Sequence, residues 1–189
     1  MKKINCFIPF ENAEQATDTV NELRQNAVCA KVFLLKTPES EGSIEGCEEI
    51  AIDSLYSSAT IKKIAAAADA EFALLYTKYN MLRFGPFALE RMAKIASDTM
   101  SGMVYADHYN GDHYSEEGLP TSTKAPVIDY QFGSLRDDFD FGSVLLFCSK
   151  CLKKAADAMK ADYKHAGLYD LRLKLSQFAQ LTHINEFLY

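Results

Sequence analysis

Two short apolar runs flank one amphipathic segment in the middle of the chain. They are Phe72–Tyr76 and Met103–Tyr105, and each stops abruptly at polar residues, with Lys78 after the first and Asp107 and His108 after the second. A strand, a crossover helix and a second parallel strand produce this pattern. Both strands should then end at the same edge of the sheet, where open α/β folds bind their ligands. We therefore expect Lys78, Asp107 and His108 to converge on one crevice.

Apolar runs and amphipathic stretches alternate along most of the chain. Apolar residues at helical spacing, such as Ala16, Val20 and Leu23, predict the first helix, with Asn12 as its cap and Gln15 completing a capping box. The alternation predicts an α/β fold, namely a doubly wound, mostly parallel central sheet flanked by helices, in one domain covering residues 1–189. The predicted strands are Ile4–Phe7, Val32–Leu35, Glu49–Asp53, Phe72–Tyr76, Met103–Tyr105 and Ser143–Phe147, and later helices are predicted over Ala59–Ala70, Ser149–Met159 and about Leu168–Ala179.

A small antiparallel hairpin is predicted near residues 105–115. Asn110-Gly111 is the strongest two-residue hairpin signal, and it stands between two similar tripeptides. With a turn at that dipeptide, His108 lies opposite His113. Cross-strand partners point to the same face, so the two imidazoles are expected to be able to meet.

Composition narrows the class of protein. The chain has 189 residues, 48% of them apolar, and a net charge of −6 without a visibly basic face, which disfavours nucleic-acid binding. The apolar run Ile4–Phe10 is too short for a signal peptide or a membrane span. Five scattered cysteines are typical of reduced thiols in a cytoplasmic protein, and for the isolated pair Cys148 and Cys151 an ordinary helix start is favoured over a zinc or redox site. The apolar end Phe187–Tyr189 is unusual for a natural terminus and is compatible with one piece of a longer protein.

Polar residues at the ends of predicted strands are candidates for ligand binding. No Walker loop and no GxGxxG is present, so the glycine fingerprint of the common nucleotide folds is missing. Residues at or near strand ends are nevertheless expected to line a nucleotide pocket. These donor-site candidates are Pro9, Glu11, Thr37, Asp53 and Lys78.

Several carboxylates and imidazoles have two interpretations each. Asp107 is a metal or ribose ligand or a turn cap, and His108 with His113 is a metal pair or two surface neighbours. With Asp107 they would also suit a metal-dependent hydrolase, although that site needs a third ligand. Arg136, Asp138 and Asp140 either bind substrate or form a solvated loop. Asp170 is either a general base or a carboxylate that favours a helix start. His165 is expected to cap the C-terminus of the preceding helix.

Four segments together resemble a family-2-type glycosyltransferase of the GT-A fold. Ile4–Asn12 resembles the opening strand of that family, and Ala73–Tyr76 with the later Phe87–Met92 resembles its central strand and following helix. Met103–Tyr109 resembles the next strand. The last match, which resembles the segment around the catalytic carboxylate and the strand after it, is Tyr169–Leu175 followed by His183–Tyr189.

This resemblance implies an activity. It implies transfer of a sugar, with inversion, from a nucleotide-sugar donor to a hydroxyl of a glycan or lipid-linked acceptor, as in polysaccharide biosynthesis. Asp170 would be the base that deprotonates the acceptor hydroxyl. A divalent cation, manganese or magnesium, would stabilise the leaving diphosphate.

One departure from the family pattern matters. The family places a DxD metal motif directly after the central strand, where this chain reads Thr77-Lys78-Tyr79-Asn80. Three alternatives follow. Lys78 neutralises phosphate charge in place of the metal, Asp107 with His108 holds the metal, or the domain is non-catalytic and binds a nucleotide, a sugar or another domain.

Overall fold

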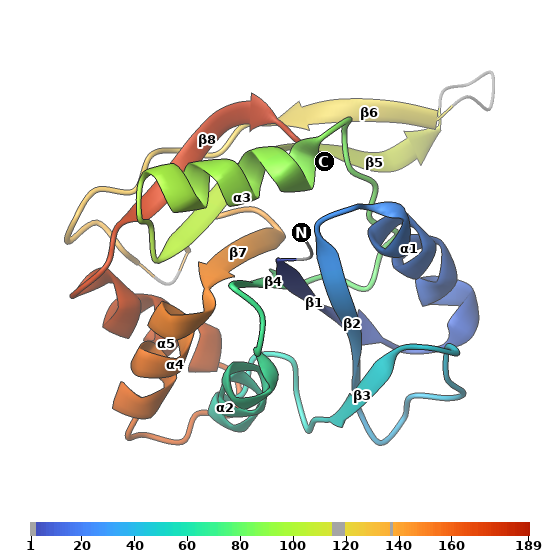
Figure 1. Cartoon of the computed structure of the whole chain (residues 1–189), viewed down its shortest axis with the longest axis horizontal. Coiled ribbons are helices and arrows are strands. Elements are labelled where there is room, and N and C mark those ends of the chain that lie inside the picture. Colours follow the sequence, from blue (N-terminus) through green and yellow to red (C-terminus); the bar gives the residue numbers. More distant parts are fainter. Residues whose placement is uncertain (1–2, 115–119, 137) are drawn as a thin grey trace.

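The computed structural model describes residues 3–114, 120–136 and 138–189, and of residues 112–114 and 120–121 only the backbone is described. Within this part, eight strands form one sheet in the order β3-β2-β1-β4-β7-β5-β6, and β8 also pairs with β5 (Figure 1). The strands are β1 Ile4–Phe10, β2 Cys29–Lys36, β3 Glu48–Ala51, β4 Phe72–Tyr76, β5 Met103–Tyr114, β6 Pro120–Ala125, β7 Val144–Cys148 and β8 Leu181–Phe187. The helices are α1 Ala13–Gln25, α2 Ser58–Ala67, α3 Ala88–Asp98, α4 Ser149–Ala158 and α5 Gly167–Ser176.

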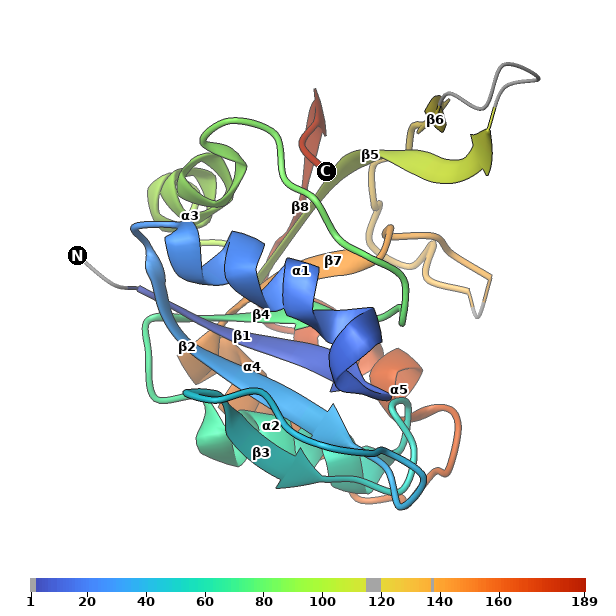
Figure 2. The same cartoon turned by 90° about the vertical axis from the view of Figure 1, so that its right-hand side faces the viewer.

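Helices cover both faces of the sheet, as Figure 2 shows. One face packs against α1 and α3, and the other against α2, α4 and α5. The strand β1 divides its side chains between the two cores, because Cys6 and Ile8 face α1 whereas Phe7 faces the opposite side and stacks on Phe33. This period of two is what a strand buried on both faces requires. The predicted α/β class with a mostly parallel sheet is therefore confirmed.

The middle of the sheet differs from the simplest expectation. The strands β1, β2 and β4 are parallel neighbours, but β7 lies antiparallel between β4 and β5. Since both β4 and β5 run against β7, they still point in the same direction. Their ends therefore lie at one edge, as predicted, with the start of β7 between them.

The predicted turn at Asn110-Gly111 is wrong. Strand β5 continues through both residues to Tyr114 and pairs antiparallel with β6, so His108 lies opposite Ala125 and His113 opposite Thr121. The register shifts between Asn110 and His113, which shows that the dipeptide marks an irregularity within the strand. Glycine in a strand is often found at such a bulge. The antiparallel pairing of the predicted element is present, but it joins β5 to β6 and not the two halves of β5.

Local signals placed the helix starts well. Asn12 Oδ1 accepts a hydrogen bond from the backbone N–H of Gln15 at 2.9 Å and so caps α1, and Ser57 caps α2 through the N–H of Thr60. Gln15 Oε1 accepts from the N–H of Glu11, one residue before the position that a capping box would use.

Among the described residues, no helix has the length and apolar character needed to cross a membrane.

Candidate functional site

Two clefts open at the carboxyl edge of the parallel strands. The larger, called the Lys78 cleft here, has a volume of about 720 Å³ and lies beyond β4, β7 and β5. The smaller, called the Asp53 cleft, has about 480 Å³ and lies beyond β2 and β3. The Lys78 cleft is lined by Tyr76, Lys78, Asn80, Met81, Leu82, Arg83, Phe84, Gly85, His108, Tyr109, Asn110, Gly111, Ser122, Ser143 and Tyr189. The Asp53 cleft is lined by Lys36, Thr37, Pro38, Glu49, Ala51, Ile52, Asp53 and Lys63.

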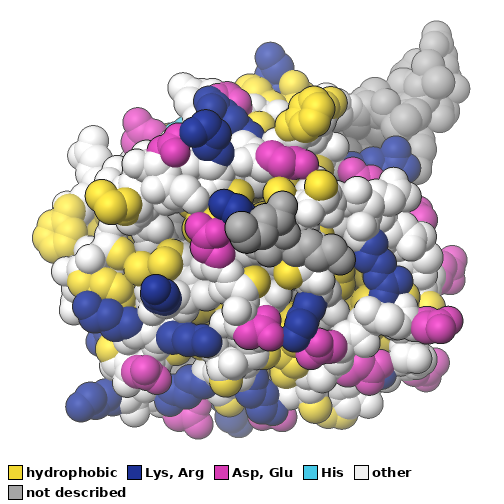
Figure 3. Space-filling view, viewed as in Figure 1, with side chains coloured by type: hydrophobic (Ala, Val, Ile, Leu, Met, Phe, Trp, Pro, Cys, Tyr) yellow, Lys and Arg dark blue, Asp and Glu magenta, His cyan; other side chains and the backbone are white. Residues whose placement is uncertain are grey.

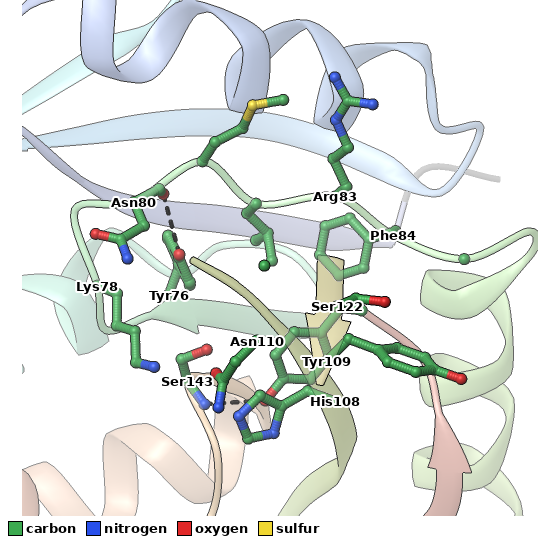
Figure 4. Close-up of a pocket in the computed structure, with 15 residues that line it drawn as sticks. Tyr76, Lys78, Asn80, Arg83, Phe84, His108, Tyr109, Asn110, Ser122 and Ser143 are labelled. Atoms are coloured by element: carbon green, nitrogen blue, oxygen red, sulfur yellow. Dashed lines mark hydrogen bonds between the residues drawn. The ribbon is translucent and has the colours of Figure 1, made fainter. Parts of the chain in front are cut away.

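The Lys78 cleft has a polar end and an apolar wall. In Figure 4 the side chains of Lys78, Asn110 and His108 extend toward Ser143, while Arg83 points away from them. Phe84 lies on the apolar side, where its ring is 6.5 Å from that of Tyr189. None of the fifteen lining residues is an aspartate or a glutamate. The cleft thus differs from the face in Figure 3, where acidic and basic side chains are interspersed.

His108 is the buried imidazole of this cleft. Only 5% of the residue is exposed, and its ring stacks on Tyr189 with centroids 5.1 Å apart and planes 5° from parallel. Its Nδ1 is buried without a hydrogen-bond partner. Burial lowers the pKa of His108, and Lys78 lowers it further, against the opposing effects of Asp140 and Asp107. The neutral imidazole is therefore favoured in the folded protein.

Tyr189 fixes the floor of the cleft. Its hydroxyl oxygen accepts hydrogen bonds from the N–H groups of Ser143 at 2.9 Å and Val144 at 3.2 Å. Burial raises the pKa of this phenol, although the two N–H donors oppose the shift. The hydroxyl lies so close to Gly142 that a Cβ there would collide with it, and Gly142 also has a positive φ of 72°. Glycine is thus required at the start of β7 for both reasons.

Asp107 is engaged in holding a loop, away from His108. It is 2% exposed, and its Oδ1 accepts from the N–H of Val127 at 2.8 Å and lies 2.9 Å from Nε2 of His183. The other nitrogen of His183, Nδ1, lies 2.7 Å from Oδ1 of Asp129. Successive residues of a strand point to opposite faces, so Asp107 and His108 do not lie together.

Tyr105, beneath this chain of polar groups, contacts the same loop. Its hydroxyl donates to the carbonyl of Ile128 and accepts from the N–H of Tyr130, both at 2.8 Å, and its ring stacks on His183. Burial raises the pKa of Tyr105 to about 12. Asp107, His183 and Tyr105 together hold the segment that leads to Arg136–Asp140 against the sheet.

The predicted donor-site residues divide between the clefts. Thr37 and Asp53 line the Asp53 cleft, whereas Lys78 lines the other. Pro9 is buried in β1, and Glu11 is exposed beside the start of α1, and neither lines a cleft. The structure thus brings Thr37 and Asp53 together and leaves Lys78 nearer to His108.

The predicted base, Asp170, lies in the first turns of α5. It is 9% exposed, and its Oδ1 is 3.6 Å from the Lys174 ammonium. Its Oδ2 is buried without a hydrogen-bond partner. Asp170 lines neither cleft, and Asp107 does not either.

The remaining candidates lie further out. Arg136 and Asp138 form an exposed ion pair with 3.2 Å between Nε and Oδ1, and Asp140 accepts from the N–H of Gly142 at 2.7 Å. Cys148 caps α4 without a side-chain hydrogen bond, and both it and Cys151 are free thiols. His165 is exposed, and the side chain of His113 lies outside the described residues.

Arg172 has a position in the structure that its sequence neighbours do not predict. This side chain is largely buried, its guanidinium lies 4.9 Å above the ring of Phe141, and its Nε has no hydrogen-bond partner. Burial lowers the pKa of Arg172, against opposing effects of Asp140, Tyr169 and Tyr56. An arginine between two leucines on a helix gives no sequence signal of such burial. The roles of Tyr105 and Tyr189 also have no sequence signal, because their hydrogen-bond partners are distant in the sequence.

No protein-family model and no curated protein sequence matches the chain. Solved structures do match. S. aureus TarS 1–349 superimposes on all of this chain with a TM-score of 0.68 at 13% identity, and 60% of that chain is covered. TarS 1–349 in complex with UDP-GlcNAc gives a TM-score of 0.64 at 14% identity. A CMP:2-keto-3-deoxy-manno-octonic acid synthetase complexed with CTP gives 0.57 at 11% identity, with 98% of this chain and 91% of that chain covered.

The chain spans half the length of another similar structure, the bifunctional IspDF from Campylobacter jejuni, which it matches with a TM-score of 0.57. At such low identities these likenesses show the fold alone. The fold is GT-A-like, as the sequence resemblance implied.

Proposed function

We propose that this chain binds a nucleotide-sugar donor at the carboxyl edge of its sheet and transfers the sugar, with inversion, to a hydroxyl of a glycan or lipid-linked acceptor. The observation that carries the proposal is the presence of two clefts at this one edge of a GT-A-like sheet. Ligands of open α/β sheets bind at that edge. A place in polysaccharide biosynthesis follows from the proposed chemistry, and a cytoplasmic location from the free thiols.

The proposed roles follow the position of each residue along the edge. Thr37 and Asp53 contact the nucleoside in the Asp53 cleft, with Pro9 and Glu11 at the end of the neighbouring strand, and Lys78 contacts the diphosphate. The residues proposed to contact the acceptor are Arg136, Asp138 and Asp140.

Asp170 is the proposed base. It takes the proton from the acceptor hydroxyl, whose oxygen attacks the anomeric carbon as the bond to the nucleoside diphosphate breaks. The buried Oδ2 of Asp170, which has no donor, supports a role beyond structure, because buried polar groups in folded proteins are normally satisfied.

The residues present do not fit a divalent cation at this edge. Magnesium and manganese prefer carboxylate and other oxygen ligands, but no aspartate or glutamate lines the Lys78 cleft, and the Asp107 carboxylate faces His183. In the described part of the chain, no three His, Cys, Asp or Glu side chains gather in a metal-binding arrangement. We therefore assign no reaction step to a cation.

The Asp170→Asn variant tests the proposed base. A general base contributes roughly 10²–10⁴-fold to rate, so the nearly isosteric variant should bind the donor normally and lose about that factor in turnover. Transfer is measured with a panel of nucleotide sugars, and binding by calorimetry. Lys174→Met, which removes the ion-pair partner of Asp170, is the control for a purely structural effect. Full turnover with a lowered melting temperature in Asp170→Asn would assign Asp170 to stability.

A non-catalytic domain that binds a nucleotide or a sugar is the second candidate. Two observations favour it, since no carboxylate follows β4 and Asp170 lines neither cleft. This candidate predicts that a nucleotide sugar binds but is neither transferred nor hydrolysed by the unmutated chain. Transfer activity that is lost in Asp170→Asn would exclude it.

A further inference from the structure

The Lys78 cleft is basic although the protein is acidic. The chain has 26 acidic and 20 basic residues, yet the polar end of this cleft holds the Lys78 ammonium, and none of the fifteen lining residues is an aspartate or a glutamate. An even distribution of charge would place some acidic side chains there. The cleft is therefore suited to a negatively charged ligand.

The ammonium of Lys78 is available for such a ligand. The residue is exposed at the end of β4, and within the described part of the chain no hydrogen bond or ion pair engages its side chain. Figure 4 shows it directed toward Ser143, with Asn110 and His108 on the other side of the same space. A compact cation with three N–H donors suits a phosphoryl oxygen.

His108 is held so that one ring nitrogen is left for the ligand. Its Nδ1 is buried at a position 3.4 Å from where a Cβ of Gly142 would lie, so no ligand reaches it. Stacking on Tyr189 fixes the ring plane. A neutral imidazole carries one proton, and with it on Nε2 the ring donates a hydrogen bond to the cleft while Nδ1 remains a buried acceptor.

We propose that Lys78, His108 and Asn110 bind the diphosphate group of the donor directly, in place of a bridging divalent cation. This inference rests on the proposed function, since it identifies how the donor is held at the same site. The Lys78 ammonium opposes the charge of the diphosphate, while His108 Nε2 and the Asn110 amide donate to its oxygens. When the nucleoside diphosphate leaves, the same donors stabilise the negative charge that develops on it.

Calorimetry with nucleoside diphosphates tests the inference. UDP, CDP, GDP and ADP, and pyrophosphate as a base-free probe, are titrated in EDTA and again in manganese or magnesium. We expect the best-bound diphosphate to have the same affinity within about twofold in both conditions. A lost charge-assisted contact corresponds to about 10- to 100-fold in affinity, so Lys78→Ala should weaken diphosphate binding by that factor. The free nucleoside should bind equally to both proteins.

A matched control separates local contact from net charge. Lys94→Ala removes one positive charge from the exposed surface of α3, where Lys94 pairs with Asp98, and should leave diphosphate affinity unchanged. The imidazole resonances provide a readout independent of affinity. The signals that disappear in His108→Gln should shift when pyrophosphate is added to the unmutated protein in EDTA.

The outcomes distinguish the inference from the proposed function. Binding that requires manganese or magnesium, or that is unaffected by Lys78→Ala, overturns the inference and leaves the nucleotide-sugar proposal standing. Competition by glycerol 3-phosphate that is stronger than by pyrophosphate also overturns it, because the cleft would then hold an acceptor phosphate. If no nucleoside, nucleoside diphosphate or nucleotide sugar binds the unmutated chain, both proposals are wrong.

Discussion

His108 shows how one side chain combines burial with a position at the site. It is packed between Tyr189 and Gly142, and its charged form is disfavoured by burial and by Lys78. The neighbouring Asp140 and Asp107 oppose this only partly. Protonation of the ring therefore lowers the stability of the folded chain.

His108 should make stability depend on pH in the mildly acidic range. Its pKa is lowered from 6.5 in the folded state, so the unfolded chain takes up the proton first as the pH falls. The contribution of His108 to the free energy of unfolding is thus complete above about pH 6.5 and is lost as the pH falls toward the folded pKa. Denaturant titrations of the unmutated chain and of His108→Gln at several pH values measure the difference.

We expect the unmutated chain to lose more stability than His108→Gln between about pH 7.5 and pH 5. His165→Gln, at an exposed position, is the matched control and should follow the unmutated chain. Parallel curves for His108→Gln and the unmutated chain would contradict the prediction.

The start of β7 is the element on which the Lys78 cleft depends. Strand β7 lies between β4 and β5, and the N–H groups of Ser143 and Val144 donate to the Tyr189 hydroxyl. The same hydroxyl lies against Gly142. The hydrogen bonds from the start of β7 therefore fix the ring of Tyr189, and this ring in turn fixes the stacked imidazole of His108.

Gly142→Ala should destabilise the protein more than the same change at Gly133. Both glycines have positive φ values, 72° and 87°, but only at Gly142 would the new methyl group meet the Tyr189 hydroxyl. The left-handed backbone alone costs about 1–2 kcal/mol for an alanine, and overpacking adds about 1–3 kcal/mol. Urea unfolding of the two variants measures the difference, and equal losses would show that Tyr189 moves aside freely.

At the level of the whole molecule, the sheet places two clefts along one edge. The parallel strands β3, β2, β1 and β4 end there, and β5 ends in the same direction although β7 separates it from β4. Thr37 and Asp53 line one cleft, and Lys78 lines the other. A donor with its nucleoside in the first and its diphosphate in the second would contact both.

Such a donor predicts additive losses in a double variant. Asp53→Ala should weaken binding of both the nucleoside and the nucleoside diphosphate, whereas Lys78→Ala should weaken only the diphosphate. Sites without shared partners add within about 0.5 kcal/mol, so the double variant should show the sum of the two losses in binding free energy. Calorimetry with the best-bound nucleoside diphosphate provides the comparison. An unchanged affinity in Asp53→Ala would remove the nucleoside from the Asp53 cleft.

The amino-acid sequence by itself determined the class of the fold, the helices, and strands β1 to β4 and β7, but it predicted only the first part of β5 and did not predict β6. Apolar periodicity and caps such as Asn12 and Ser57 act over a few residues, so they can be interpreted without the rest of the chain. The same pattern placed Lys78 at a strand end on the binding edge, because strand direction follows from the alternation of strands and helices.

Only the tertiary structure decided which side chains meet. β7 enters between β4 and β5 from a later part of the chain, and Asn110-Gly111 continues a strand because β6 pairs beside it. The Asp107 carboxylate contacts the imidazole of His183, which is 76 residues away in the sequence, and therefore lies apart from His108. Contacts between distant segments depend on how the whole core packs, and hydrophobic burial has no direction that a local pattern could reveal.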